Sequence, residues 1–197
     1  MSNKIKNPTT NQTIHINSKG GATAIKSSNY SHGKMSNVPI GTIFPKRIDA
    51  LKAKVHGMSQ AGIHSRKGQP AYSIVLNDGY IDDEDFGDII IYTGEGGNDP
   101  KTKHQIRDQT LTKGNLALTL NIKNDIPVRV LRGPKHNSAL PKPKGYRYDG
   151  LFYVVDSWEE INSDGFLIYR YKLMNDAAIN DIDYAPVPGE TILLKHK

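Results

Sequence analysis

A short stretch of the chain combines two aromatic rings, a carboxylate and a hydroxyl. Tyr80 and Asp83 lie in the acidic segment 78–85, and Tyr92 and Thr93 follow soon after it. Two rings can stack on the two faces of a flat heteroaromatic ligand, while a carboxylate accepts a hydrogen bond from an exocyclic amine of that ligand. The spacing indicates one strand–loop–strand unit, so these four side chains are candidates for a single ligand site.

The acidic run itself has two other interpretations. Residues 82–85, with Asp88, carry enough carboxylates to bind a hard cation, but their spacing does not match the alternating acidic loop of an EF-hand. A solvated acidic loop is the ordinary interpretation of such a run. What favours a ligand site is the position of the run between two tyrosines.

Motifs for catalysis are missing from the sequence. The glycine-rich segment 94–97 lacks the Lys-Ser/Thr ending of a phosphate-binding loop, and neither Ser73 nor Ser157 lies in a G-x-S-x-G motif. The 7 histidines lack metal-ligand spacing, His136-Asn137 is only a dipeptide of an HNH nuclease motif, and cysteine is absent. We therefore predict a binding domain that uses no catalytic residue, metal or cofactor.

The charges are segregated along the chain. Residues 1–48 hold seven basic residues and no acid, although the net charge of the whole chain is only +6. Residues 78–99 hold eight acids and no base, whereas residues 101–147 hold eleven bases and two acids. A basic arm followed by a basic band is typical of proteins that bind the phosphate backbone of nucleic acids. A soluble protein with a basic tail is an equally good explanation of charge alone.

The polar segment 1–36 shows no hydrophobic periodicity, so we expect a flexible basic arm there. Apolar spacing predicts a short helix from about Lys46 to Val55, and a second helix that Asp108 caps and that carries leucines 111–120. β-Branched and aromatic runs predict strands at 71–76, 88–93, 127–132, 150–156 and 165–173. This order predicts an α+β fold with a mainly antiparallel sheet or a partly open barrel.

The segment beyond Met174 is acidic and loop-like, so residues 175–197 are expected to form a tail or the start of a further segment. The sequence contains neither a secretion signal nor a run of apolar residues long enough to cross a membrane. An intracellular protein is the expectation, in the cytoplasm of a bacterium or the nucleus of a eukaryote, with no membrane partner.

A series of short blocks follows in order between residues 38 and 174. They are Val38-Pro-Ile-Gly-Thr-Ile-Phe44, Gln60-Ala-Gly-Ile-His64, Ala71-Tyr-Ser-Ile-Val-Leu76, Asp78-Gly-Tyr-Ile-Asp-Asp-Glu-Asp85, Ile91-Tyr-Thr-Gly-Glu-Gly-Gly-Asn-Asp99, Pro127-Val-Arg-Val130 and Gly145-Tyr-Arg-Tyr-Asp-Gly150. With these blocks the chain resembles the SRA (SET- and RING-associated) domain family, also called YDG after Tyr148-Asp149-Gly150. The domain is expected over residues 37–174.

The resemblance implies a PUA-like fold, a twisted and partly open antiparallel β-barrel with flanking helices. It also implies binding to duplex DNA with a modified cytosine, 5-methylcytosine or 5-hydroxymethylcytosine, flipped out of the base stack. By position, Tyr80 and Tyr92 would sandwich the flipped base, Asp83 would accept from its amino group, and Thr93 would contact the pyrimidine edge. Asn77 and Asp78 would form the turn whose backbone contacts the base.

Further DNA contacts are implied outside this site. Gln60 corresponds to a loop residue that fills the gap left by the flipped base, and His64 lies in the same block. A finger-like loop corresponds to residues 100–107 and is shorter than in relatives that read hemimethylated sites. The resemblance and the basic band together make the following residues candidate DNA contacts: Lys101, Lys103, His104, Arg107, Lys142, Lys144 and Arg147. The motif Tyr148-Asp149-Gly150 is expected to serve packing and turn geometry.

Three functions stay open at this point. The first is a module that recognises modified cytosine without chemistry of its own. The second is the targeting half of a modification-dependent HNH-type restriction endonuclease, because the acidic block and the short finger resemble microbial SRA domains; a nuclease domain or subunit would then be a partner. The third, a chromatin reader that recruits partners, is disfavoured because the sequence has no RING, SET or histone-reading module.

Overall fold

The computed structural model describes residues 3–6, 13–16, 22–24 and 30–181, the first three ranges by their backbone alone. The chain divides into two units, Met1–Ser31 and His32–Lys197. In the first unit β1 (Asn3–Lys6), β2 (Thr13–Ile16) and β3 (Ala22–Ala24) pair antiparallel in that order. The composition predicted no element here, and the Ile and Thr residues of these segments favour extended backbone. The remainder of the predicted arm up to residue 29, and the tail from 182, lie outside the described residues.

The second unit is built on a sheet of 8 strands that does not close among the described residues. Its order is β5-β6-β9-β10-β11-β8-β7, with β4 paired to β10. Only β6 and β9 run parallel among these strands; the other neighbours are antiparallel. The strands are β4 (Ile43–Phe44), β5 (Ile63–His64), β6 (Ser73–Leu76), β7 (Glu84–Asp85), β8 (Ile89–Thr93), β9 (Val128–Arg132), β10 (Tyr146–Ile161) and β11 (Leu167–Met174).

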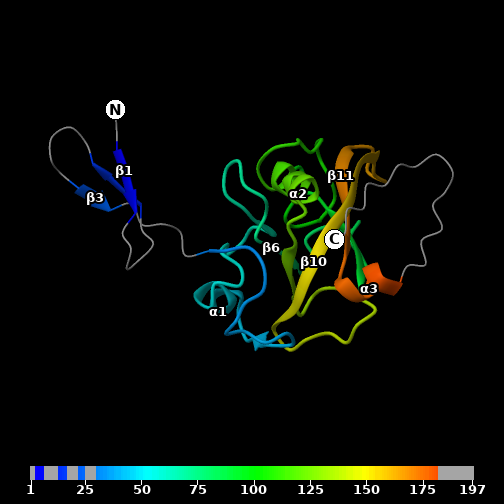
Figure 1. Ribbon diagram of the computed structural model, residues 1–197. Helices are drawn as coiled ribbons and strands as arrows, with labels where there is room; N and C mark the ends of the chain where they lie inside the picture. Colours follow the sequence, from blue (N-terminus) through cyan, green and yellow to red (C-terminus); the bar gives the residue numbers. More distant parts are fainter. Residues whose placement is uncertain (1–2, 7–12, 17–21, 25–29, 182–197) are drawn as a thin grey trace. The chain divides into compact units, whose positions relative to one another are not determined.

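Strand β10 joins the two halves of the sheet. This 16-residue strand is drawn in yellow and is the longest in the described chain (Figure 1). Its first part pairs with β9 and its second part pairs with β11, with a register irregularity between Tyr148 and Leu151. Gly150 lies at that irregularity with φ 93°, a backbone conformation that glycine adopts without strain. The motif Tyr148-Asp149-Gly150 is therefore the point where β10 bends.

Helix α2 (Lys113–Asn124) packs against the sheet. The Tyr171 hydroxyl of β11 donates to the Asn115 carbonyl at 2.9 Å, which ties the start of the helix to that strand. Near the helix end the Asn121 side chain both accepts from the Ala71 N–H at 2.8 Å and donates to the Ala71 carbonyl at 3.0 Å. These buried side-chain bonds fix α2 beside the residues that lead into β6.

Two apolar clusters bury both faces of β6 and β9. Ile74 of β6 and Val130 of β9 belong to the larger cluster with Leu118 of α2. Val75 and Leu131, one position further along the same strands, belong to the second cluster with Val38, Phe44, Ala50, Val55 and Tyr148. Side chains of a strand alternate between its faces, so continuous apolar runs such as 73–76 are expected where both faces are covered.

The predicted α+β class, with a mainly antiparallel and partly open sheet and flanking helices, is confirmed. The five predicted strands appear as β6, β8, β9, β10 and β11, and the first predicted helix appears as the shorter α1 (Arg47–Lys52). The prediction that Asp108 caps the second helix is wrong. Thr112 precedes α2, whereas the Asp108 carboxylate accepts from the Leu167 N–H at 2.9 Å, outside the helix. The short α3 (Asp176–Asp181) was not predicted.

Candidate nucleic-acid interface

The two tyrosines of the predicted site come from a strand of the sheet and from a loop beside it. Tyr92 lies on β8 and is only 3% exposed, while Tyr80 lies in the loop that leads from β6 to β7 and is half-buried. The Tyr80 hydroxyl accepts a 2.7 Å hydrogen bond from the Gly96 N–H. Burial raises the pKa of Tyr80 to about 12 and raises that of Tyr92 well above its usual value. The charge of Asp83 adds to the rise in the pKa of each phenol, so all three side chains lie within electrostatic range of one another.

The Asp83 carboxylate is held by the end of β8. Its Oδ1 accepts from the Thr93 N–H at 2.8 Å. Burial raises the pKa of Asp83 to about 6, and the hydrogen bonds from Thr93 together with the charge of Arg170 oppose that rise. At neutral pH the group is therefore mostly ionised and can accept further hydrogen bonds.

Arg170 of β11 holds the surroundings of Asp83 in place. Its guanidinium donates to the Thr93 hydroxyl at 3.2 Å and to the Asp82 carbonyl. It also forms an ion pair with Glu84 at 2.7 Å and lies 3.7 Å from Glu160. The buried Arg170 guanidinium contacts Asp82 and Glu84, which flank Asp83, and also Thr93 on β8. These contacts fix the Asp83 carboxylate relative to the strand. The sequence carries no motif that would have identified this arginine.

The turn after β6 is formed by the other two predicted base-site residues. Asp78 is exposed and has φ 59°. The Asn77 side chain is engaged in the fold: its amide donates to the Tyr146 hydroxyl at 3.3 Å and accepts from the Lys135 N–H at 3.2 Å. This leaves backbone contact as the role that Asn77 can have in the site.

The predicted gap-filling residue lies on the loop that joins α1 to β5. Gln60 is exposed at this loop. The loop ends at Gly62, where a Cβ atom would come within 2.6 Å of the Tyr92 hydroxyl. Only glycine allows the loop and the ring to approach so closely. His64, which follows on β5, is 5% exposed, and its Nδ1 accepts from the Gly57 N–H at 3.1 Å. Its DNA contact stays a prediction, and the buried ring serves the loop.

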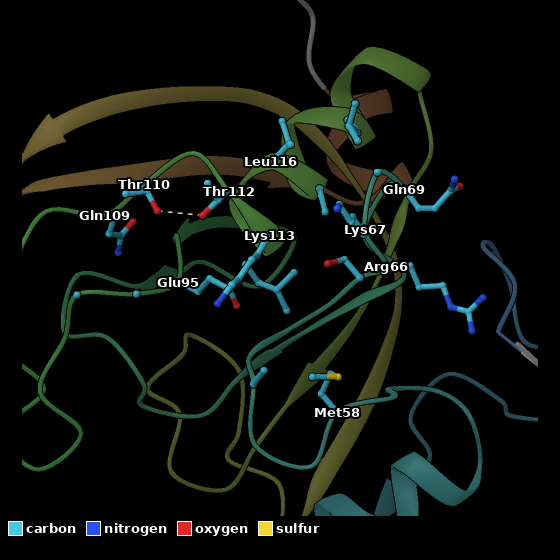
Figure 2. Close-up of a pocket in the computed structure, with 18 of the residues that line it drawn as sticks. Met58, Arg66, Lys67, Gln69, Glu95, Gln109, Thr110, Thr112, Lys113 and Leu116 are labelled. Atoms are coloured by element: carbon cyan, nitrogen blue, oxygen red, sulfur yellow. Dashed lines mark hydrogen bonds between the residues drawn. The ribbon is translucent and has the colours of Figure 1, made fainter.

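A surface groove of about 1050 Å³ begins beside this loop (Figure 2). Gly96, whose N–H binds the Tyr80 hydroxyl, is one of its lining residues, whereas Tyr80, Asp83 and Tyr92 are not. Figure 2 shows Arg66 and Gln69 on one side of the groove with Glu95 and Lys113 on the other. The charged residues that line it are Arg66, Lys67, Arg107, Lys113, Glu95 and Asp108. The Glu95 carboxylate accepts from the Gly114 N–H at 2.9 Å, at the start of α2. The Asp108 carboxylate accepts from the Leu167 N–H at 2.9 Å. The groove therefore offers four cations to a ligand, while both of its carboxylates already bind backbone N–H groups.

Sequence reasoning singled out only Arg107 among these four cations. Arg66 and Lys67 lie on the β5–β6 loop, immediately after the Gln60–His64 block, and Lys113 begins α2. Lys113 belongs to the basic band 101–147, whereas Arg66 and Lys67 lie far from it in the sequence, which concealed that these residues line one groove. The basic pair at 66–67 was the available signal.

The remaining predicted contacts lie in two loops. In the finger-like loop Lys101, His104 and Arg107 are exposed and Lys103 is half-buried. His104 Nδ1 lies 2.8 Å from an Asp164 carboxylate oxygen, which anchors the loop to the β10–β11 turn.

In the second loop Lys142 and Lys144 are exposed. Arg147 is paired with Asp149 through Nε at 2.5 Å and donates to the Pro141 carbonyl at 3.2 Å. Its guanidinium thus serves the fold, whereas the two lysines stay free for solvent or phosphate in their exposed loop.

A buried ion network lies under the acidic loop. Asp85 of β7 accepts two hydrogen bonds from Arg132 of β9, at 2.6 and 2.8 Å, and lies 2.8 Å from His136 Nε2. Burial alone would raise the pKa of Asp85, but the hydrogen bonds from Arg132 and His136 hold it well below its usual range. Arg132 also pairs with Asp149 at 2.8 Å. The aspartate of Tyr148-Asp149-Gly150 is therefore part of a structural network, as expected from the sequence.

The described part of the chain meets the requirements of neither a metal site nor a membrane span. No group of three or more histidine and acidic side chains is arranged to hold a metal ion there. No helix among the described residues is long and apolar enough to cross a membrane.

Comparison with known proteins agrees with this architecture. The chain is 38% identical over 188 residues to the E3 ubiquitin-protein ligase UHRF1 of Xenopus laevis, a match that covers 84% of this chain and 23% of UHRF1. The structure is similar to the modification-dependent TagI restriction endonuclease (43% identity, TM-score 0.69, 74% of this chain and 53% of that one). It is also similar to the SUVH5 SRA domain bound to fully hydroxymethylated CG DNA (36% identity, TM-score 0.64, 84% of this chain and 99% of that one).

The matches cover most of this chain but only part of its longer relatives. The chain spans about a quarter of the length of the curated relatives it matches. Residues 31–178, which contain the sheet, α2 and the Tyr80–Tyr92 site, match the SAD/SRA domain family as a whole. The chain belongs to the SAD/SRA domain family.

Proposed function

We propose that this SRA domain binds duplex DNA at a modified cytosine and holds that base, flipped out of the stack, between Tyr80 and Tyr92. The observation that carries the proposal is the Asp83 carboxylate, which accepts from the Thr93 N–H at 2.8 Å and whose charge helps raise the pKa of both Tyr80 and Tyr92. An ionised carboxylate accepts from the cytosine amino group, which thymine lacks. Recognition of an edge that pairs with guanine in the duplex requires that the base leave the stack.

The energies are of the right size for this mechanism. Extrusion of one base costs a few kcal/mol of stacking and pairing. Stacking on each aromatic ring returns about 1–3 kcal/mol. A buried methyl group adds only about 0.8 kcal/mol, so the modification is distinguished by the fit of the pocket more than by its apolar area.

Two complexes of SUVH5 support cytosine modification as the feature that is read, since one contains fully methylated CG DNA and the other contains fully hydroxymethylated CG DNA. In these two structures the SUVH5 SRA domain is 38% and 36% identical to this chain over the matched regions. We therefore propose 5-methylcytosine and 5-hydroxymethylcytosine as the two candidate ligands.

The test is a binding competition at fixed salt between identical duplexes that carry cytosine, 5-methylcytosine or 5-hydroxymethylcytosine. Tyr80→Ala and Asp83→Ala are expected to abolish the preference for a modified duplex. Tyr80→Phe keeps the stacking face and should retain it, and Asp88→Asn, an exposed neighbour of the acidic loop, is the matched control for Asp83. Equal affinity for the three duplexes, unaffected by these substitutions, would overturn the proposal.

A second function is favoured by the similarity to the TagI restriction endonuclease. In that case the domain directs a nuclease domain or subunit to modified DNA, and the chain supplies recognition while another polypeptide segment supplies cleavage. Plasmid DNA with and without 5-methylcytosine, incubated with the chain and Mg²⁺, tests this division of roles. Binding without cleavage is expected; cleavage by the chain alone would contradict it.

A further inference from the structure

One arginine holds the whole loop that carries Gln60. Arg47, the first residue of α1, donates from Nε to the Met58 carbonyl at 3.2 Å and from Nη1 to the Gln60 carbonyl at 2.9 Å. Its Nη2 donates to the Ala61 carbonyl. A guanidinium presents its N–H groups in a rigid, planar fork, so three carbonyls on one fork fix the path of the loop backbone.

Buried histidines attach the same loop to the sheet. The His56 ring is fully buried, with Nε2 3.1 Å from the Ala61 carbonyl and Nδ1 2.9 Å from the Ser73 hydroxyl of β6. Burial lowers the pKa of His56 to about 3, so the ring is neutral. His56 Nε2 also lies 3.0 Å from Arg47 Nη2, so the ring contacts the guanidinium as well as the loop carbonyl. Together with the bond from Gly57 to His64, these contacts hold the loop at both ends.

The contacts determine what the loop presents to its surroundings. With its carbonyls turned onto Arg47, the loop leaves the side chains of Ser59 and Gln60 exposed. Its last residue, Gly62, lies against the Tyr92 hydroxyl. Arg47 and Tyr92 also lie close enough for each to influence the pKa of the other. The same guanidinium therefore connects the loop tip with one ring of the base site.

We propose that Arg47 is a positioning residue for base extrusion: it preforms the 58–61 loop so that Gln60 enters the duplex in the gap left by the flipped base. This proposal rests on the proposed function. A loop that is already ordered enters the DNA without the entropic cost of immobilisation, and that saving appears in the affinity. Arg47 itself faces the loop backbone, so its contribution reaches the DNA through Gln60.

The experiment compares two duplexes that differ only opposite the modified cytosine. In one the base is paired with guanine; in the other it lies opposite an abasic site, so that there is neither a pair to open nor an orphaned guanine to support. We expect Arg47→Ala to weaken binding to the paired duplex by about tenfold and to change binding to the abasic duplex by less than about twofold. Arg47→Lys keeps the charge but cannot contact three carbonyls, so it should lose most of the same affinity.

A double-mutant cycle links the effect to the loop tip. In a Gln60→Ala background, Arg47→Ala should cost little more on the paired duplex, because the side chain that it positions is gone. Lys52→Ala removes one exposed charge from the same helix and is the matched control. Amide hydrogen exchange of residues 58–61 should speed up in both Arg47 variants while the melting temperature reports whether the domain is folded.

The outcomes separate the two proposals. If the wild-type chain does not prefer a modified paired duplex over an unmodified one, the proposed function fails before Arg47 is tested. If the preference holds and Arg47→Lys binds the paired duplex like the wild type, the positioning role is overturned. Equal losses on both duplexes, or additive effects with Gln60→Ala, overturn it as well. Should Arg47→Ala not fold, the Lys variant carries the same comparison.

Discussion

Arg170 faces Thr93 across the β8–β11 pair, and its Nη1 donates to the Thr93 hydroxyl at 3.2 Å. The same guanidinium donates to the Asp82 carbonyl, while the Thr93 N–H donates to Asp83. Arg170 thus holds both Asp82, which precedes Asp83 in the chain, and Thr93, whose N–H binds the Asp83 carboxylate. Arg170 therefore positions Asp83 through these neighbouring residues and not through either tyrosine ring.

We predict that Arg170→Met lowers the affinity for modified DNA by about tenfold, which corresponds to about 1.4 kcal/mol. The reason is that Asp83 and Thr93 lose their common anchor, while the freed Glu84 side chain, 54% exposed, stays hydrated and limits the damage to the fold. Lys172→Met on the same strand is the control, and binding to the modified duplex is the measurement. Unchanged affinity in a folded Arg170→Met variant would contradict the positioning of Asp83.

The affinity for modified cytosine should depend on pH through Asp83. Burial raises the pKa of Asp83 to about 6 in the free domain, and only the ionised carboxylate accepts from an amino group. Binding is therefore expected to be constant above about pH 7 and to weaken below pH 6, by up to tenfold per pH unit. A titration of the dissociation constant between pH 5 and 8 measures this. Asp83→Asn should bind weakly with a flat profile, and a slope that survives this substitution would assign the effect to another group.

The raised pKa of Asp83 has the opposite effect on stability: a higher pH favours DNA binding but lowers the stability of the folded domain. The folded domain binds a proton at Asp83 up to about pH 6, whereas the unfolded chain releases it near pH 3.8. Stability from this group therefore falls as the pH rises between these values and stays low above them. We expect Asp83→Asn to raise the melting temperature at pH 7–8, with the difference shrinking below pH 4. A lower melting temperature at neutral pH would contradict the burial of this charge.

The sequence predicted those elements that depend on neighbouring residues and missed those that depend on residues distant in the chain. The β-branched and aromatic runs of β6, β8 and β9 are local patterns, and their strands were located correctly. Two-residue strands such as β4 and β5 exist only through pairing with distant strands, so no local pattern announces them. The full length of β10 was missed because Gly150 reads as a boundary, whereas in the structure it is a bend inside the strand.

The candidate site divides in the same way. Tyr80, Asp83 and Tyr92 lie within one short segment, and their chemistry was apparent from type and spacing. Arg47 and Arg170 act through carbonyls and hydroxyls of distant segments, so nothing in their sequence neighbourhood identifies them. A lone arginine in a sequence is usually a surface residue. Only the fold shows that Arg170 is buried and Arg47 half-buried against the loops of the site.

The network around Asp85 should decide the stability of the domain. The Asp85 side chain is fully buried and that of Arg132 is 2% exposed. Loss of Asp85 therefore removes the bidentate partner of a buried guanidinium, which keeps only its bond to Asp149 as an ion pair. We predict that Asp85→Ala lowers the free energy of unfolding by about 3–5 kcal/mol. Because the pKa of Asp85 is lowered in the folded domain, we also expect the wild type to lose this stabilisation as the pH falls below about 4. Urea unfolding checks both effects, with the exposed Asp88→Asn as control; equal stabilities of the two variants would contradict the network.

We predict that the cations of the groove contribute to DNA affinity in a way that depends on the salt concentration and not on the modified base. Arg66, Lys67 and Lys113 line one groove that adjoins the base site, and phosphate contacts fix a protein on DNA without reading its sequence. Replacement of all three by Gln should reduce the slope of log affinity against log salt by about 0.9 per lost phosphate contact. The ratio of affinities for modified and unmodified duplexes should not change.

Lys123→Gln is the matched control, because this exposed lysine lies in the last turn of α2 and outside the groove. Binding titrations at several salt concentrations, on modified and unmodified duplexes, give both the slope and the ratio. An unchanged slope in the triple variant would show that the DNA backbone runs elsewhere. A lost preference with an unchanged slope would mean that these cations act on the base site itself.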